Sequence, residues 1–227
     1  MKPSLLIRSL LIAGLVAMAG AAAAQDEAPE AVPEGLQLID DTNLALVYIL
    51  PDVDMSRYAR IFLETPYIAF KENWQREQNR KWQSKRVSTD DMERIKSELA
   101  SLFMDVFSKT LGDSGYQLTT AAGADVLLIK PAIINLDIVA PDTRSPGNTY
   151  SYSETAGEMT LYMEFYDSVS GQLIAKALDR KRDRITGSFR WRNKVSNRAA
   201  ANRILQVWAD VLKEGLDDSG VSRPGGN

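Results

Sequence analysis

Two segments of the sequence combine many basic side chains with tryptophan, a combination suited to holding anionic groups. Residues 71–86 contain six basic and two acidic residues, and residues 176–198 contain nine basic and two acidic ones. The guanidinium group of arginine can donate two hydrogen bonds to the oxygens of a phosphate or carboxylate, and an indole ring adds apolar contact. The alternative is that these charges bind no partner. The segments would then be a solvated loop and an edge strand, whose charges prevent the strand from pairing with other chains. The candidate binding residues are Trp74, Arg76, Arg80, Lys81, Trp82, Arg180, Arg182, Arg190, Trp191 and Arg192.

A group of acidic residues between the two basic segments invites comparison with glycoside hydrolases. Glu158, Glu164 and Asp167 are the candidates, because that reaction needs two carboxyl groups a fixed distance apart. On one strand face, Glu158 and Glu164 would lie about 20 Å apart at ~3.3 Å per residue, which is too far. Solvated charge on a strand is the favoured interpretation. A carboxylate-dependent hydrolase of envelope glycans is the alternative function.

A second acidic pattern resembles the start of a calcium-binding loop. Asp52, Asp54 and Ser56 have the required spacing, but Arg57 and Leu63 stand where glycine and a bidentate carboxylate are needed. We therefore predict a turn in which Asp side chains bond to the backbone.

The residue types that are missing exclude several chemistries. The sequence contains no cysteine and no histidine, so thiol catalysis, histidine relays, and thiolate or imidazole metal ligation are excluded. Glycine-rich phosphate loops and the serine–lysine nucleophile signature have no match. We therefore expect no catalytic residue, no cofactor and no metal site, and we expect the protein not to be an enzyme.

Two long amphipathic helices are predicted from the spacing of apolar residues. Apolar residues three and four positions apart predict one helix over Asp90–Leu111, with Thr89 or Asp90 as its N-terminal cap. The same spacing predicts a second helix over Asn197–Leu216. The expected apolar face of the second helix consists of Ala200, Ile204, Val207, Trp208, Val211 and Leu212.

Strands are expected in most of the remaining chain. Pro66 lies within the strand expected over Arg60–Phe70. Because proline has no backbone N–H to donate to a neighbouring strand, this strand should lie at an edge of the sheet or contain a bulge there. The order of elements predicts an α+β two-layer sandwich, with a mainly antiparallel sheet and both helices on one face. The expected strands are Leu44–Leu50, Arg60–Phe70, Val126–Val139 as one bent strand or two short ones, Gly157–Tyr166 and Leu173–Ile185, the last two joined by a hairpin loop.

The N-terminus has the pattern of a secretory signal. Lys2 and Arg8 precede an uncharged Leu- and Ala-rich stretch, and we expect cleavage after Ala24. A membrane anchor would need about 20 apolar residues, and this stretch is shorter. Without cysteine the protein is not lipidated, so we expect a periplasmic protein. The expected domains are a signal peptide over 1–24, a flexible acidic leader over 25–40, a single domain over 41–218 and a disordered tail over 219–227.

Three stretches of the sequence have a recognisable combined pattern: Val47–Tyr48 leading to Pro51–Tyr58, Gly123–Leu128 and Glu164–Ala175. Together they resemble a bacterial envelope family, domain of unknown function 3313, whose members are exported proteins and lipoproteins. The resemblance implies an envelope protein without an established activity, and it transfers no catalytic residue. The missing acceptor cysteine distinguishes this chain from the lipidated members and puts outer-membrane anchoring in doubt.

We therefore expect a non-enzymatic binding or assembly-accessory protein of the cell envelope. Its expected partner is an envelope protein or an anionic lipid or glycan surface, reached through the basic segments. Nucleic acid is disfavoured by export and by the acidic total, a formal net charge of −3. The sequence leaves open whether the two basic segments share one face, and what the oligomeric state is.

Overall fold

The computed structural model describes residues 35–40, 42–81, 86–138, 151–153, 155–184, 190–192 and 194–223. Within these ranges, the side chains of residues 81, 151–153, 155–156, 183–184, 190–192 and 194–197 are outside the description. All described residues belong to one compact unit, Pro33–Asn227.

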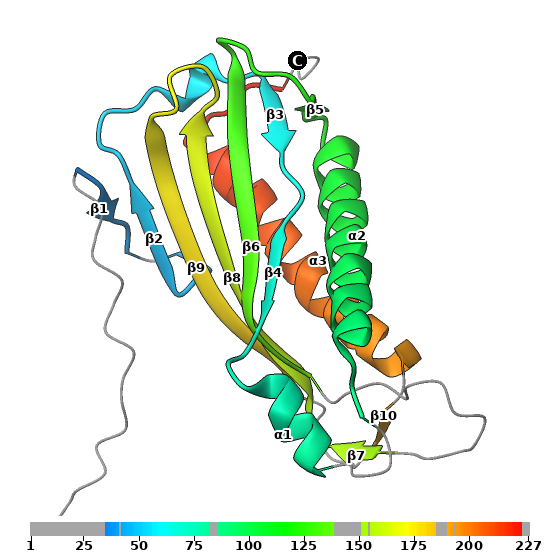
Figure 1. The fold of residues 1–227 in the computed structure, drawn as a ribbon. Coiled ribbons are helices and arrows are strands. Elements are labelled where there is room, and N and C mark those ends of the chain that lie inside the picture. Colours follow the sequence, from blue (N-terminus) through cyan, green and yellow to red (C-terminus); the bar gives the residue numbers. More distant parts are fainter. Residues whose placement is uncertain are drawn as a thin grey trace, which may run out of the picture. The chain divides into compact units, whose positions relative to one another are not determined.

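An eight-stranded sheet forms one part of this unit (Figure 1). Its strands follow the order β1-β2-β9-β8-β6-β3-β5, and β4 also pairs with β6. The pairs of β9 with β2 and β8, and of β6 with β8, are antiparallel, whereas β3 and β4 join β6 in parallel. The strands are β1 (Gln37–Leu38), β2 (Leu46–Ile49), β3 (Arg60–Leu63), β4 (Tyr67–Phe70), β5 (Gln117–Leu118), β6 (Val126–Ile138), β8 (Thr155–Asp167) and β9 (Leu173–Arg184).

The remaining elements are helices and a small second sheet. The short strands β7 (Ser151–Ser153) and β10 (Arg190–Arg192) pair with each other. The helices are η1 (Met55–Arg57), α1 (Trp74–Lys81), α2 (Thr89–Asp113) and α3 (Lys194–Ser219). The predicted α+β class with a mainly antiparallel sheet is confirmed.

The hydrophobic core joins α2 and α3 to alternate residues of the central strands. In β8, Met159, Leu161, Met163 and Phe165 are buried in the same cluster as Phe103 of α2 and Trp208 of α3. Figure 1 shows α2 and α3 next to each other beside this sheet. The alternation in β8 was the feature that predicted a half-buried strand, and the burial pattern confirms it.

The cap of helix α2 is Ser88, one residue before the caps expected from the sequence, and the helix begins at Thr89. The Ser88 hydroxyl accepts the amide of Asp91, and the Asp91 carboxylate accepts the amide of Ser88, each at 3.1 Å. This reciprocal capping box satisfies two amides that the helix itself cannot use. Neither Thr89 nor Asp90 is therefore the cap.

Three local expectations need correction. The strand expected over Arg60–Phe70 is divided into β3 and β4 around Pro66, in keeping with the missing donor of proline. The helix α1 was not expected. In α3 the expected apolar face is confirmed at Ala200, Ile204, Trp208 and Leu212, which are buried, but Val207 is 46% exposed and Leu205 is fully buried instead.

Both ends of the domain extend further than the sequence indicated. Leu36 is buried and Gln37–Leu38 pair with β2, although residues up to 40 were expected to be a flexible leader. Val221 is buried and the amide of Ser222 bonds to the Tyr58 carbonyl at 2.8 Å, within the expected tail. The expected signal peptide, residues 1–24, lies outside the described residues. In the described part of the chain, no helix has the length and apolarity needed to cross a membrane.

Candidate functional site

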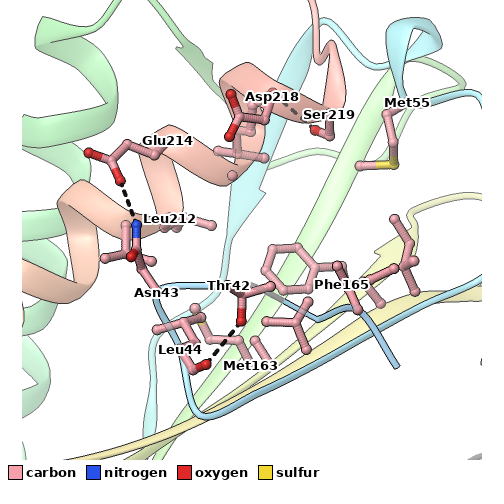
Figure 2. Close-up of a pocket in the computed structure, with 18 of the residues that line it drawn as sticks. Thr42, Asn43, Leu44, Met55, Met163, Phe165, Leu212, Glu214, Asp218 and Ser219 are labelled. Carbon is pink, nitrogen blue, oxygen red and sulfur yellow. Dashed lines mark hydrogen bonds between the residues drawn. The ribbon is translucent and has the colours of Figure 1, made fainter. Parts of the chain in front are cut away.

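A pocket of about 450 Å³ lies between the C-terminal half of α3 and the sheet at β2, β8 and β9 (Figure 2). This volume is within the range of about 300–1,000 Å³ that is common for small-molecule sites. Its walls are mostly apolar. The principal wall residues are Val47, Ile49, Met163, Phe165, Leu212 and Leu216.

The pocket floor is a furrow along β9, where two small residues lie between larger ones. Strand register places each alanine of β9 directly between a side chain of β2 and one of β8 on the same sheet face. Protein interiors are otherwise close-packed, so a pair of small residues at alternate positions leaves space above the strand. The two rows are Val47–Ala177–Met163 and Ile49–Ala175–Phe165.

A third small residue opens the wall opposite this furrow. Gly215 lines the pocket from α3, and a Cβ added to it would meet no neighbouring atom within 4 Å. Glycine inside a helix costs about 0.5–1 kcal/mol relative to alanine. The pocket thus has small residues on both walls, two alanines on the sheet and an exposed glycine on α3.

Acidic side chains surround the pocket mouth. Asp40, Glu214 and Asp218 line it and are exposed to solvent. The Asn43 amide donates to Glu214 Oε2 at 3.3 Å, and Figure 2 shows this contact across the mouth. Of the described residues that line the pocket, none is basic. The mouth is therefore electronegative.

The loop over residues 42–44 closes one side of the pocket and is fixed to the sheet. The amide of Ala45 donates to Asp179 Oδ1 at 3.2 Å, and the Thr42 hydroxyl donates to the Leu44 carbonyl at 2.9 Å. Asp179 is buried, so this carboxylate holds the loop from within the core.

The opposite face of the sheet carries a compact polar cluster around Glu164. Its carboxylate accepts the hydroxyls of Tyr162 and Tyr166 at 2.7 and 2.6 Å and lies 3.0 Å from Lys176 Nζ. Burial raises the pKa of Glu164, but these hydrogen bonds outweigh it, and the pKa is lowered overall. Burial and the Glu164 hydrogen bond raise the pKa of Tyr166 to about 12. The cluster is internally satisfied and its carboxylate is ionised at neutral pH.

Two of the predicted anion-binding residues, Arg180 and Arg182, both contact Glu158. Their Nε atoms each donate to the Glu158 carboxylate at 2.7 Å. Although burial raises the pKa of Glu158, the hydrogen bonds from the two arginines lower it overall. Both guanidinium groups remain largely exposed on the other side of this contact.

The two basic segments meet at the end of the sheet where β6 stops. Lys71 Nζ lies 3.5 Å from Asp137 Oδ2, and strand register places Asp137 opposite Glu158 and Glu158 opposite Arg182. Asp137, Glu158 and Arg182 therefore form one row across the sheet, in which two strand spacings of about 4.8 Å separate β6 from β9, and Lys71 contacts the β6 end of this row. Acidic residues in the same row compensate much of the positive charge.

The other predicted binding residues differ in their surroundings. Trp74 is buried, stacks on Phe70 with a centroid distance of 4.2 Å and donates its indole N–H to the Ile138 carbonyl at 2.8 Å. It is a core residue, so its inclusion among the exposed binding residues is corrected here. Arg76 and Arg80 are exposed on α1.

The remaining candidates are only partly within the described structure. Trp82 lies outside it. Lys81, Arg190, Trp191 and Arg192 belong to α1 and β10, but their side chains are outside the described residues.

None of the predicted binding residues that the structure describes lines the pocket. The sequence signal that could have indicated the pocket is the pair of alanines at alternate positions of β9, together with a glycine in the apolar part of α3. The predicted turn at Asp54 is confirmed: its carboxylate accepts the Ser56 amide at 3.0 Å at the start of η1.

Comparison with known proteins identifies a family. The family described as protein of unknown function (DUF3313) matches residues 35–212, which include the sheet, α2 and most of α3. No curated protein matched the sequence.

The solved structures that the comparison found share little sequence with the chain. Protein XCC0632 from Xanthomonas campestris is 13% identical with a TM-score of 0.39, over 74% of this chain and 90% of that one. A PelC dodecamer from Paraburkholderia phytofirmans is 10% identical with a TM-score of 0.36, over 73% and 95%. A DUF4136 family protein from Bacteroides thetaiotaomicron is 13% identical with a TM-score of 0.37, over 84% and 100%.

Proposed function

The chain belongs to the DUF3313 family of proteins of unknown function, and we propose that it is a non-enzymatic binding protein of the cell envelope. In this proposal, an apolar part of the ligand occupies the pocket between β9 and α3. The secretory pattern of residues 1–24 supports the envelope location, and we propose cleavage after Ala24 and a periplasmic mature protein without a lipid anchor.

The observation that carries the binding role is the pocket itself. Ala175 and Ala177 leave room above β9, and Gly215, an exposed residue of α3, lines the same space from the other side. Apolar side chains line this space, and a ligand that removes them from water gains about 0.8 kcal/mol for each buried methylene.

The carboxylates of the sheet support a role other than glycoside hydrolysis. That reaction uses a general acid whose pKa is raised, whereas the pKa values of Glu158 and Glu164 are both lowered. Basic or hydroxyl groups surround each of them.

Filling the pocket from either wall tests the proposal. The neutral fluorescent probe N-phenyl-1-naphthylamine should bind the wild-type protein saturably, with an emission increase on transfer to an apolar site. Ala175→Leu and Gly215→Leu should each reduce this binding at least tenfold. Ala121→Leu, a matched change at an exposed position outside the pocket, should leave it unchanged.

Circular dichroism and thermal unfolding of each variant show whether the fold is kept. Unaltered probe binding in both filled and folded variants would exclude the pocket as the binding site.

A second candidate role, contact with an anionic lipid, glycan or acidic partner through the basic segments, is favoured by one observation. The row from Lys71 to Arg182 brings the two segments to the same end of the sheet. The two basic segments also contain exposed arginines, namely Arg76, Arg80, Arg180 and Arg182. Glu158 and Asp137 reduce the local positive charge, so this surface should bind more weakly than the sequence alone indicates.

A further inference from the structure

The pocket separates apolar and charged groups in a way that defines a class of ligand. Its interior is formed by apolar side chains, whereas the charged lining residues Asp40, Glu214 and Asp218 are exposed at the mouth. A ligand that fits must bury an apolar chain and leave a polar head beside these carboxylates. An amphiphile has this shape, with one apolar and one polar end.

The charged residues near the pocket mouth determine which charge is favoured on the polar head of the ligand. Two basic residues of this part of the chain, Lys213 and Arg223, both contact Asp217. Neither of them lines the pocket. The electrostatic environment of the mouth is therefore negative.

The end of α3 adds to this negative potential. The helix has 26 residues and ends at Ser219, and Asp218 and Ser219 both line the pocket. A helix C-terminus carries a partial charge of roughly −0.5 from its free carbonyl groups, and cations are favoured beside it. Side-chain charge and helix dipole thus favour the same kind of head group.

We propose that the pocket selects amphiphiles with a cationic head, such as an alkyl amine or a quaternary ammonium, over neutral and anionic ones of equal chain length. This inference rests on the proposed binding function and specifies its ligand class. The apolar chain lies between β9 and α3, and the positive head lies among Asp40, Glu214 and Asp218. An anionic amphiphile is disfavoured at the mouth although its chain fits the interior.

Three probes with the same ten-carbon chain test the proposal on the full-length mature protein: decyltrimethylammonium, decanol and decanoate. Calorimetric titration below the micelle concentration at 0.05 M salt should give the ammonium an affinity about tenfold above that of the alcohol, with decanoate the weakest. At 0.5 M salt the difference between ammonium and alcohol should fall to about twofold or less, because the mouth is exposed and screened.

Two sets of variants separate charge at the mouth from total charge. Combining Asp40→Asn, Glu214→Gln and Asp218→Asn should bring the ammonium and alcohol affinities within about twofold of each other. Combining Asp105→Asn, Asp113→Asn and Glu93→Gln changes the total charge equally on α2, which does not line the pocket, and should keep the tenfold preference.

The outcomes distinguish this inference from the binding function on which it rests. Equal affinities for ammonium and alcohol, or a preference for decanoate, would overturn the head-group selectivity and leave the apolar pocket function standing. Loss of the preference in the α2 control as well would assign it to total charge and overturn the inference. If no probe binds, or if Gly215→Leu leaves all affinities unchanged, both the inference and the proposed function fail.

Discussion

Trp208 and Asp179 are joined by a buried hydrogen bond, in which the indole Nε1 of α3 donates to the Oδ2 oxygen of β9 at 2.7 Å. The same oxygen lies 2.7 Å from Lys181 Nζ, and Oδ1 accepts the amide of Ala45. A single carboxylate thus joins the helix, the strand and the loop that closes the pocket. Such a residue is costly to remove, because its loss leaves buried donors without an acceptor.

A double-mutant cycle measures the Trp208–Asp179 contact. Trp208→Phe should cost about 1.5–3 kcal/mol of unfolding free energy from the lost charge-assisted bond, in addition to any packing loss. In an Asp179→Ala background this cost should fall, with a coupling of about 1–2 kcal/mol in urea unfolding. The same cycle with Asp105→Ala, an exposed residue of α2, should show coupling below ~0.5 kcal/mol. Equal coupling in the two cycles would mean that the hydrogen bond contributes nothing specific.

Asp167 should make the protein sensitive to acid. Its carboxylate accepts the amides of Ser170 and Val169 at 2.7 and 3.1 Å and the Tyr58 hydroxyl at 3.1 Å. Hydrogen bonds, led by that from the Ser170 amide, outweigh burial and lower its pKa from 3.8 to about 2. Because the folded pKa lies below the unfolded one, this stabilisation is present above pH 3.8 and is lost as the pH falls towards 2.

The expected loss from Asp167 is about 2 kcal/mol between pH 5 and pH 2. In Asp167→Asn the side-chain oxygen can still accept the turn amides, but the titration is gone. Between pH 5 and pH 2, the unfolding free energy of Asp167→Asn should therefore fall by about 2 kcal/mol less than that of the wild type. Chemical denaturation at a series of pH values compares the two proteins, and parallel curves would show that Asp167 does not titrate in this range.

The sequence predicted those features that depend on local periodicity. The three-and-four spacing of α2 and the alternation of Met159, Leu161, Met163 and Phe165 are visible within one element, and the structure confirms both. The cap was missed by one residue because Ser88, Thr89 and Asp90 are all good capping residues. Only the reciprocal bond from Asp91 selects among them.

The pocket could not be predicted, because it depends on contacts between distant segments. Ala175 and Ala177 form a furrow only once β2 and β8 flank β9 in the observed register. Gly215 contributes only because α3 crosses above them. Likewise, the pairing of Arg180 and Arg182 with Glu158 depends on the register of β8 against β9, which places Glu158 opposite Arg182.

Trp74 shows why composition misled the assignment of the first basic segment. Its neighbours in sequence are charged, so an exposed position was expected. In the structure, stacking on Phe70 and a bond to the Ile138 carbonyl compensate the cost of burying the indole N–H. The signal that decides its burial therefore lies in β4 and β6, outside its own segment.

Alanine at Gly215 should stabilise the protein, because the residue is within a helix and the added Cβ meets no neighbouring atom within 4 Å. We expect a gain of about 0.5–1 kcal/mol in unfolding free energy. Gly115→Ala is the matched control of opposite sign: Gly115 has φ +88°, and alanine there should cost about 1 kcal/mol. Destabilisation by Gly215→Ala would mean that the space beside Gly215 is filled in solution.

The mature protein should begin at Gln25. Signal peptidase prefers small residues before the cleavage point, and Ala22 and Ala24 provide them. Intact-mass measurement of the protein from a periplasmic extract checks this directly. A membrane-bound form that retains residues 1–24 would contradict both the cleavage site and the proposed location. As a control, Ala24→Asp should block processing and shift the protein to the membrane fraction.

The last prediction concerns the basic surface at the end of the sheet. If Arg180 and Arg182 can bind anionic partners, Glu158 is their competitor, because it accepts hydrogen bonds from both. Glu158→Gln should therefore increase co-sedimentation with phosphatidylglycerol vesicles about fivefold, since each charge near an anionic surface contributes about 1 kcal/mol.

Substituting the two arginines should have the opposite effect. Arg180→Ala combined with Arg182→Ala should reduce vesicle binding below that of the wild type. The gain in Glu158→Gln should disappear between 0.1 and 1 M salt, as the screening length falls from ~10 to ~3 Å. Asp105→Asn makes the same charge change on α2 and separates the local contact from total charge. An equal gain in this control, or no response of the wild type and Glu158→Gln to vesicles at low salt, would leave these arginines as structural partners of Glu158 alone.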